Sequence, residues 1–251
     1  MANHFREGLK ARRPQLGQWL STGSVTVADM NRDAGWDWCL VDMEHTPNEV
    51  AQVHAQLLAL AAGPAAALVR PYWNDSVLVK RLLDAGAQSF VFPMIQTPEE
   101  AAAAVAATRY PPEGIRGVAL SHTSNRYGRD KGYLERISEE IAVVVQIETK
   151  EAMDRIEDIA AVPGVDGLFF GPADIGASLG MIGDVERPEL WEAIYAAAER
   201  VRPMGMPVGT LTGNPVRVRE ALDRGFLFVS CGTDLSLLVK ATAAQIAAVR
   251  G

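Results

Sequence analysis

The chain has 251 residues, of which 48% are hydrophobic and 22% are charged. This balance is typical of a globular protein with a buried core and excludes the disordered and fibrous classes. The formal net charge is −7 and no run of Lys and Arg occurs, so the sequence predicts no nucleic-acid partner. No apolar stretch approaches the roughly 20 residues that span a bilayer, and we expect no membrane partner and a cytoplasmic location.

Short runs of β-branched and aromatic residues alternate along the chain with longer segments of helical character. This alternation is typical of repeated strand–helix units and a parallel sheet. The predicted strands cover about 16–20, 37–43, 66–70, 89–93, 142–148, 166–170, 207–211 and 226–231. The predicted helices cover about 25–34, 47–62, 76–85, 98–108, 149–161, 188–203, 214–223 and 234–249.

Residues that end and begin helices support these boundaries. Four glycines shortly before predicted strands fit the left-handed position at which a helix ends; they are Gly35, Gly86, Gly164 and Gly225. Segments 46–49 and 97–100 each place Thr before Pro, with Glu three positions after the Thr. This pattern predicts a helix start with Thr as the N-cap.

Eight strands with short connections predict an α/β fold of the (β/α)8 TIM-barrel type, which usually has about 250 residues. We interpret residues 1–251 as a single domain, because no linker-like stretch divides them. A long insertion at about 109–141 precedes the fifth strand, and a C-terminal helix is expected at about 234–249. Such insertions serve as lids, binding loops or assembly contacts, and the sequence does not distinguish among these roles.

The carboxyl ends of barrel strands converge on one face, so polar residues there surround a single pocket. Glu148 and Asp174 follow the fifth and sixth strands, just where two apolar runs end. Two carboxylates without paired cysteines favour a divalent ion that prefers oxygen; we expect Mg²⁺ or Mn²⁺, with Co²⁺ or Zn²⁺ as alternatives. The other interpretation is that Glu148 pairs with Arg70 and Asp174 caps a helix.

Two cationic or titratable side chains follow the neighbouring strands. Arg70 ends an apolar run and would project into the pocket, where it suits an enolate or carboxylate oxygen; its alternative role is to hold nearby acids in place. His45 follows the second strand beside Asp42 and Glu44, a setting suited to proton exchange near neutral pH, although a surface loop histidine would look the same. His122, in the insertion, could also approach the pocket.

The five lysines all fall outside the predicted strands; they are Lys10, Lys80, Lys131, Lys150 and Lys240. A Schiff-base enzyme needs a desolvated amine in its pocket. A metal ion is the other route to stabilising an enolate.

Five segments of this chain form a recognisable set: 40–49 (LVDMEHTPNE), 68–75 (LVRPYWND), 82–101 (LLDAGAQSFVFPMIQTPEEA), 144–153 (VVQIETKEAM) and 167–180 (GLFFGPADIGASLG). In this order they resemble the HpcH/HpaI family of metal-dependent, class II pyruvate aldolases, and the resemblance covers essentially the whole chain. It implies an aldolase that forms or cleaves a carbon–carbon bond between the enolate of pyruvate, or a related 2-oxo acid, and an aldehyde. It also implies a divalent metal cofactor and a homo-oligomer, specifically a hexamer.

The resemblance also implies a role for each matching residue. His45 would be the general base that takes a methyl proton from pyruvate, Arg70 would stabilise the enolate oxygen, and Asp42 would lie near His45. Glu148 and Asp174 would be the metal ligands. The implied substrate-binding positions are Gln146, Gly171, Pro172, Ala173 and Asp174, with Trp19 and Leu211 as pocket walls.

Asp84 is the family position credited with raising the basicity of the histidine. The predicted topology places Asp84 at the end of a helix, on the face of the barrel opposite to the pocket. If the role holds, Asp84 must reach the site of a neighbouring subunit, so the resemblance demands an oligomer.

The enzyme alternatives are lyases of the citrate lyase β or malyl-CoA type and relatives of phosphoenolpyruvate mutase. An enzyme that uses CoA should show a larger basic surface than this chain has. A further alternative is a non-catalytic barrel that binds a 2-oxo acid or a metal. The sequence does not specify the natural aldehyde.

Overall fold

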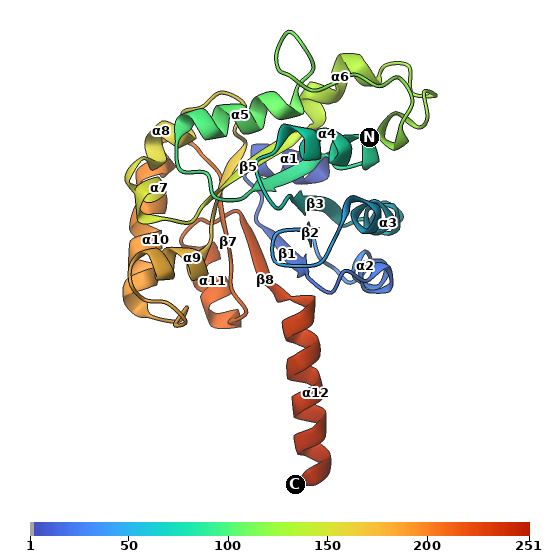
Figure 1. The fold of residues 1–251 in the computed structure, drawn as a ribbon. Coiled ribbons are helices and arrows are strands. Elements are labelled where there is room, and N and C mark those ends of the chain that lie inside the picture. The colour runs from blue at the N-terminus through green and yellow to red at the C-terminus, as the bar shows by residue number, and fades with distance from the viewer. Residues whose placement is uncertain (1–2) are drawn as a thin grey trace.

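The computed structural model describes residues 3–251, and within them eight parallel strands form a closed barrel in sequence order (Figure 1). The strands are β1 (Gln15–Leu20), β2 (Trp38–Asp42), β3 (Ala66–Arg70), β4 (Ser89–Phe92), β5 (Ala142–Ile147), β6 (Gly167–Phe170), β7 (Val208–Leu211) and β8 (Phe228–Thr233). Each overlaps a predicted strand, and the predicted TIM-barrel fold is confirmed.

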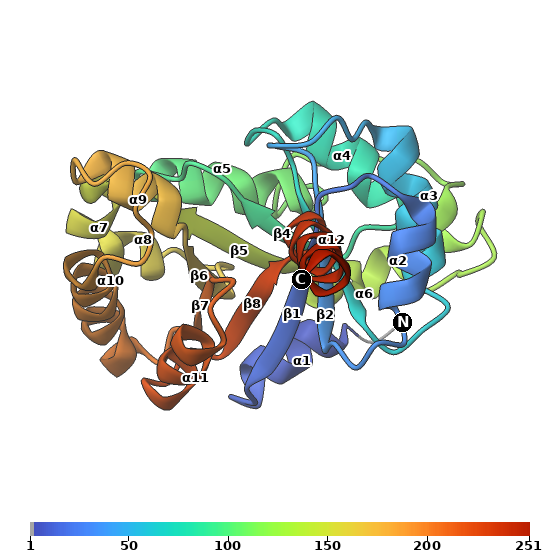
Figure 2. The same ribbon diagram turned by 90° about the horizontal axis from the view of Figure 1, so that it is seen from below.

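Helices surround the barrel, as the view onto the strand ends shows (Figure 2). They are α1 (His4–Lys10), α2 (Val25–Asn31), α3 (Val50–Leu60), α4 (Ser76–Ala85), α5 (Pro98–Thr108), α6 (Tyr133–Glu140), α7 (Lys150–Asp154), α8 (Ile156–Ala160), α9 (Pro172–Ser178), α10 (Pro188–Val201), α11 (Pro215–Asp223) and α12 (Asp234–Arg250), with 3-10 turns η1 (Thr123–Asn125) and η2 (Arg202–Met204). Among the predicted helices, 76–85 and 98–108 have the observed bounds.

Large aromatic side chains fill the inside of the barrel, and glycines on neighbouring strands make room for them. A Cβ atom on Gly17 would lie 2.1 Å from the Trp38 ring, and one on Gly209 would lie 2.4 Å from the Phe228 ring. Phe5 and Leu9 of α1 belong to the same buried cluster. Helix α1 therefore closes the amino-terminal mouth of the barrel, which leaves the carboxyl-terminal mouth for a pocket.

One of the two predicted Thr-Pro helix starts is confirmed. Thr97 accepts a hydrogen bond from the backbone N–H of Glu100, whose side chain returns to the N-cap backbone. The prediction for 46–49 is wrong, because α3 begins at Val50 with Glu49 as its N-cap. The side chains of Thr46 and Asn48 instead donate to the Asp42 carbonyl at 2.5 and 2.6 Å. These bonds hold the loop against the end of β2.

The other departures concern short helices. The predicted helix 149–161 is divided at Arg155, whose ψ of 17° separates α7 from α8. Helices α1, α6 and α9 were not predicted, because each has only seven or eight residues and lies in a loop-like stretch of sequence. The insertion at 109–141 contains η1 and α6. The four predicted helix-ending glycines all have positive φ, as expected.

Helix α12 projects away from the barrel (Figure 1). Its first residue, Asp234, is its only buried one within the described chain, and that carboxylate accepts hydrogen bonds from Thr22 and from the backbone of Ser21. Apolar side chains along the rest of the helix are exposed; they are Leu235, Leu237, Leu238, Val239, Ile246 and Val249. Within residues 3–251, no helix has both the length and the apolar character needed to cross a membrane.

Candidate active site

Strand register brings the predicted site residues together at the carboxyl-terminal mouth of the barrel. Asp42 is the register partner of Arg70 on the adjacent strand. Ile147 pairs with Phe170, so the residues that follow them, Glu148 and Gly171, are neighbours. The polar residues at these strand ends therefore share one face of the barrel, as predicted.

Arg70 is buried and held by two acids. Its Nε and Nη2 donate to the two Asp42 oxygens at 2.7 and 2.8 Å, and its Nη1 lies 2.8 Å from Glu44 Oε2. The guanidinium carbon lies 4.7 Å from the centre of the Trp19 ring. Burial alone would raise the pKa of Asp42, but the hydrogen bonds and charge of Arg70 lower it. Asp42 therefore fixes the orientation of Arg70.

His45 lies at the pocket with an open face. Its side chain is 65% exposed, and its Nε2 is 3.9 Å from Glu44 Oε2. The carboxylate of Asp42, a residue expected near His45, pairs with Arg70. Glu44 is the acid close to both Arg70 and His45; the sequence placed it at the strand end but gave it no role. Burial, followed by the charges of Asp42 and Asp174, raises its pKa against the opposing effect of Arg70 and His45.

Glu148 is almost fully buried and accepts two hydrogen bonds. The backbone N–H of Met94 donates to Oε2 at 2.6 Å, and Gln146 Nε2 donates to Oε1 at 2.5 Å. A Cβ atom at position 171 would lie 3.0 Å from Glu148 Cγ and 3.2 Å from Gln146 Nε2. A glycine at 171 thus leaves the space that these two side chains occupy.

Asp174 lies in the first turn of α9, whose N-cap is Gly171. The alternative in which Asp174 caps this helix is therefore wrong. The alternative salt bridge from Glu148 to Arg70 is not formed either, since the described ion pairs of Arg70 are those with Asp42 and Glu44.

The acids at this face suit a cation. Burial, and after it the charges of Glu44 and Asp174, raise the pKa of Glu148 to about 8 against the opposing effects of the Met94 hydrogen bond and Arg70. Gln146 Oε1 is buried without a hydrogen-bond partner in the described chain. Carboxylate and amide oxygens are the donors that Mg²⁺ and Mn²⁺ prefer. No cluster of three or more His, Cys, Asp or Glu side chains within residues 3–251 is arranged to hold a metal, so water or substrate oxygens would complete the coordination.

A cavity of about 420 Å³ opens above these residues. Nine residues expected at the site line it: Trp19, His45, Arg70, Gln146, Gly171, Pro172, Ala173, Asp174 and Leu211. Other lining residues were not predicted from the sequence; they include Phe169 within β6 and, away from the strands, Val185, Glu186, Trp191, Ser236 and Lys240. Five of these six belong to the 185–191 segment or to α12, whose positions over the barrel depend on tertiary packing.

Lys240 is the lysine that reaches this cavity among the described residues. It comes from α12, and its Nζ lies 3.4 Å from the Gly213 carbonyl. The residue is exposed, so its amine lacks the desolvation that a Schiff-base lysine needs.

Asp84 and His122 do not line this cavity. Asp84 is in the last turn of α4, where its Oδ1 lies 2.8 Å from Arg116 Nη2 and 3.8 Å from His122 Nε2. Because α4 runs antiparallel to the strands, this group lies towards the amino-terminal face, as predicted for Asp84. The expectation that His122 could approach the pocket of its own barrel is wrong.

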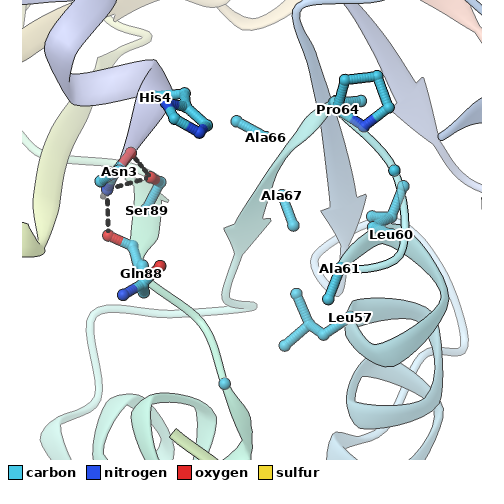
Figure 3. Close-up of a pocket in the computed structure, with 13 residues that line it drawn as sticks. Asn3, His4, Leu57, Leu60, Ala61, Pro64, Ala66, Ala67, Gln88 and Ser89 are labelled. Carbon is cyan, nitrogen blue, oxygen red and sulfur yellow. Dashed lines mark hydrogen bonds between the residues drawn. The ribbon is translucent and has the colours of Figure 1, made fainter. Parts of the chain in front are cut away.

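A second cavity, of about 360 Å³, lies at the amino-terminal ends of β3 and β4 (Figure 3). Alanine, leucine, glycine and proline form most of its wall, and the polar side chains of Asn3 and Ser89 are hydrogen bonded to each other at 2.9 Å. No Asp, Glu, Lys or Arg is among the described residues that line it.

Comparisons with known proteins agree with this geometry. A sequence model of the family described as HpcH/HpaI aldolase/citrate lyase matches residues 15–241. The chain is 46% identical to proteins named 4-hydroxy-2-oxo-heptane-1,7-dioate aldolase from Shigella sonnei and Escherichia coli, over 98% of this chain and 95% of each relative.

Solved structures are similar over the whole chain as well. A crystal structure of an HpcH/HpaI aldolase/citrate lyase family protein from Burkholderia cenocepacia is 39% identical with a TM-score of 0.96, and 100% of both chains is covered. That of an HpcH/HpaI aldolase from Desulfitobacterium hafniense is 29% identical with a TM-score of 0.89, over 99% of this chain and 97% of the other.

Proposed function

The chain belongs to the HpcH/HpaI aldolase/citrate lyase family, and from this premise we propose which residues perform its reaction. It is a carbon–carbon lyase of the aldolase type, which joins or separates a 2-oxo acid and an aldehyde. Cleavage of the dioate in the name of its relatives between C3 and C4 would give pyruvate and an aldehyde that carries a carboxylate. We propose pyruvate as the 2-oxo acid here.

Glu148 and Asp174 would hold a divalent metal ion, with Mg²⁺ or Mn²⁺ as the proposed species. The partnerless Gln146 Oε1 and the raised pKa of Glu148 support this assignment, because both indicate oxygen atoms that lack a positive partner. When bound, such an ion supplies Lewis acidity, which makes the methyl protons of a 2-oxo acid removable near neutral pH. The amides of Ala173 and Asp174, in the first turn of α9, are not used within the helix and would bind the substrate carboxylate.

His45 would take the methyl proton of pyruvate on a ring nitrogen and, in the cleavage direction, the hydroxyl proton of the aldol. Its exposed position at the pocket suits proton exchange with substrate and water. Arg70 would donate to the oxygen on which negative charge develops. A guanidinium has five N–H donors; Asp42 uses two of them and Glu44 lies close enough to use a third, so donors remain for the substrate while the group is fixed in place.

The protein would act as a homo-oligomer, as the exposed apolar side chains of α12 suggest. Six of them are between 45% and 76% exposed on a helix that leaves its own barrel, and a contiguous apolar surface of this kind usually marks a protein interface. We propose a hexamer in which Asp84 serves the site of a neighbouring subunit. Light scattering after gel filtration would measure the assembly, and a monomer would contradict this proposal.

The observation that carries the proposed function is a cavity lined by Asp174 and the fixed Arg70, with the buried Glu148 packed directly against the lining residue Gly171. In the direct test, the protein is incubated with 4-hydroxy-2-oxo-heptane-1,7-dioate and Mn²⁺, and the release of pyruvate is measured with lactate dehydrogenase and NADH. We expect pyruvate release that stops with a chelator. If the protein instead cleaves a CoA thioester such as malyl-CoA and leaves the dioate intact, the assignment as a pyruvate aldolase is wrong.

A further inference from the structure

Asp84 is held by an arginine that the insertion 109–141 buries completely. The Arg116 side chain has no exposed surface, whereas the Asp84 side chain is 26% exposed. Arg116 Nη2 donates to Asp84 Oδ1 at 2.8 Å. The pair thus joins a fully buried cation to a carboxylate that reaches the protein surface.

The insertion supplies the surroundings of this arginine. Both terminal nitrogens of Arg116 donate to the Tyr133 hydroxyl at 3.2 Å, and its guanidinium carbon lies 4.4 Å from the centre of the Tyr110 ring. The His122 ring packs edge-on against Tyr133 at 5.2 Å. Burial lowers the pKa of His122 against the opposing effect of Asp84, so Arg116 is the permanent cation beside this carboxylate.

This arrangement fixes one oxygen of Asp84 and leaves the other available. Every described contact of its carboxylate is made by Oδ1. A buried guanidinium is costly unless a carboxylate compensates it, and Asp84 is the acid that pairs with Arg116 within residues 3–251. A core salt bridge would bury both oxygens, whereas this one presents Oδ2 to the surroundings.

His45 has an open side to which a carboxylate could bind. Its side chain is 65% exposed, and within the described chain the acid nearest to its ring nitrogen is Glu44, at 3.9 Å. Space for a carboxylate therefore exists on its open side, and the topology places Asp84 of the same chain on the opposite face of the barrel.

Resting on the function and assembly proposed above, we propose that Arg116 is a positioning residue for the aldol reaction, which fixes Asp84 so that Oδ2 meets His45 of the partner subunit. The insertion 109–141 is then neither a lid nor a substrate loop. It is the scaffold that buries Arg116 and sets the direction of Asp84.

Mixed oligomers test this inference. Arg116→Met and Asp84→Asn subunits each keep His45 but lack a correctly placed carboxylate, whereas His45→Ala subunits lack the base but keep the carboxylate. Differently tagged pairs are co-expressed, the mixed assemblies are purified, and pyruvate methyl exchange is measured with Mn²⁺. Arg109→Met is the matched control, because Arg109 is a buried arginine of the same insertion whose described side-chain bond is to Thr108.

For the separate variants, we expect kcat to fall at least about tenfold in Arg116→Met and Asp84→Asn, with little change in KM, because neither residue touches the substrate. Arg109→Met should keep its kcat. The kcat of Arg116→Lys should fall less than that of Arg116→Met, because lysine keeps the positive charge. If Arg116→Met does not fold, Arg116→Lys replaces it in the test.

For the mixtures, activity should return when either variant is paired with His45→Ala, and it should stay low when Arg116→Met is paired with Asp84→Asn. Folded Arg116 variants with full kcat would overturn the inference. The inference would also be overturned if pairing with His45→Ala restored activity to Asp84→Asn but not to the Arg116 variants, because Arg116 would then have a structural role only. A wild-type protein without methyl exchange would remove the proposed function itself, and this inference with it.

Discussion

Replacing Glu148 by Gln should stabilise the metal-free protein at alkaline pH and abolish its response to divalent ions. A glutamine can still accept the Met94 hydrogen bond, and Gln146, whose Oε1 has no partner, can turn its amide to accept from the new N–H. The substitution therefore removes a buried charge without breaking the surrounding hydrogen bonds.

The magnitude follows from the pKa of Glu148, which burial, together with Glu44 and Asp174, raises from its ordinary 4.5 to about 8. A carboxyl with a higher pKa in the folded than in the unfolded chain destabilises the fold progressively as the pH rises between these two values. At about 1.4 kcal/mol for each tenfold change in proton affinity, the full effect is on the order of 5 kcal/mol above pH 8. Because 1 kcal/mol changes Tm by about 2–4 °C in a domain of this size, the variant should melt roughly 10 °C or more above wild type.

The assay is thermal unfolding in excess chelator from about pH 4.5 to 9, followed by circular dichroism. The Tm difference between Glu148→Gln and wild type should grow with pH and vanish near the acidic end. Added Mn²⁺ should raise the Tm of wild type at alkaline pH and leave that of the variant unchanged. Glu151→Gln, at an exposed acid of α7, is the control and should show neither effect. A pH-independent Tm difference, or a variant less stable at every pH, would refute this reasoning.

Three further substitutions test the geometry of the site. Arg70→Lys should lower the rate of pyruvate methyl exchange by on the order of 100-fold while the fold is retained, since a lysine cannot reproduce the planar pairing with Asp42; an unchanged rate would count against the role of the guanidinium. Asp42→Asn should reduce the free energy of unfolding by about 3–5 kcal/mol in urea titrations, because it leaves a buried arginine with a weaker partner. Gly171→Ala should weaken Mn²⁺ binding in calorimetry, because its Cβ atom would lie 3.0 Å from Glu148 Cγ and displace that side chain. Gly213→Ala is the control: its Cβ atom would contact only the flexible end of Lys240, at 3.5 Å, and this variant should bind Mn²⁺ as wild type does.

Strands and long helices were predictable because local chemistry specifies them. The α5 start at Thr97 needs only its capping box and proline, and the helix-ending glycines need only their backbone freedom. The start of α3 could not be located in the same way. Thr46 and Asn48 bond to the Asp42 carbonyl, a contact that exists only once the loop has closed on the end of β2.

Residues of the candidate site that follow strands were predictable, because the parallel register brings all strand ends to one face. The hydrogen-bond and ion-pair partners of these residues within the site were less predictable. The sequence did not specify that Asp42 is the acid that pairs with Arg70, its register neighbour on β3. Trp191 and Lys240 reach the cavity from α10 and α12, whose tertiary positions leave no local mark in the sequence.

Proton exchange tests the central claim most directly. This claim is that Glu148 and Asp174 would hold a metal ion, and that His45 would then remove a methyl proton from pyruvate. Pyruvate methyl groups would be followed by NMR in heavy water, for wild type and Glu148→Gln, with Mg²⁺ or Mn²⁺ and with a chelator. We predict exchange by metal-loaded wild type alone, lost on chelation and absent from the variant. Exchange that survives chelation, or that Glu148→Gln retains, would contradict the account.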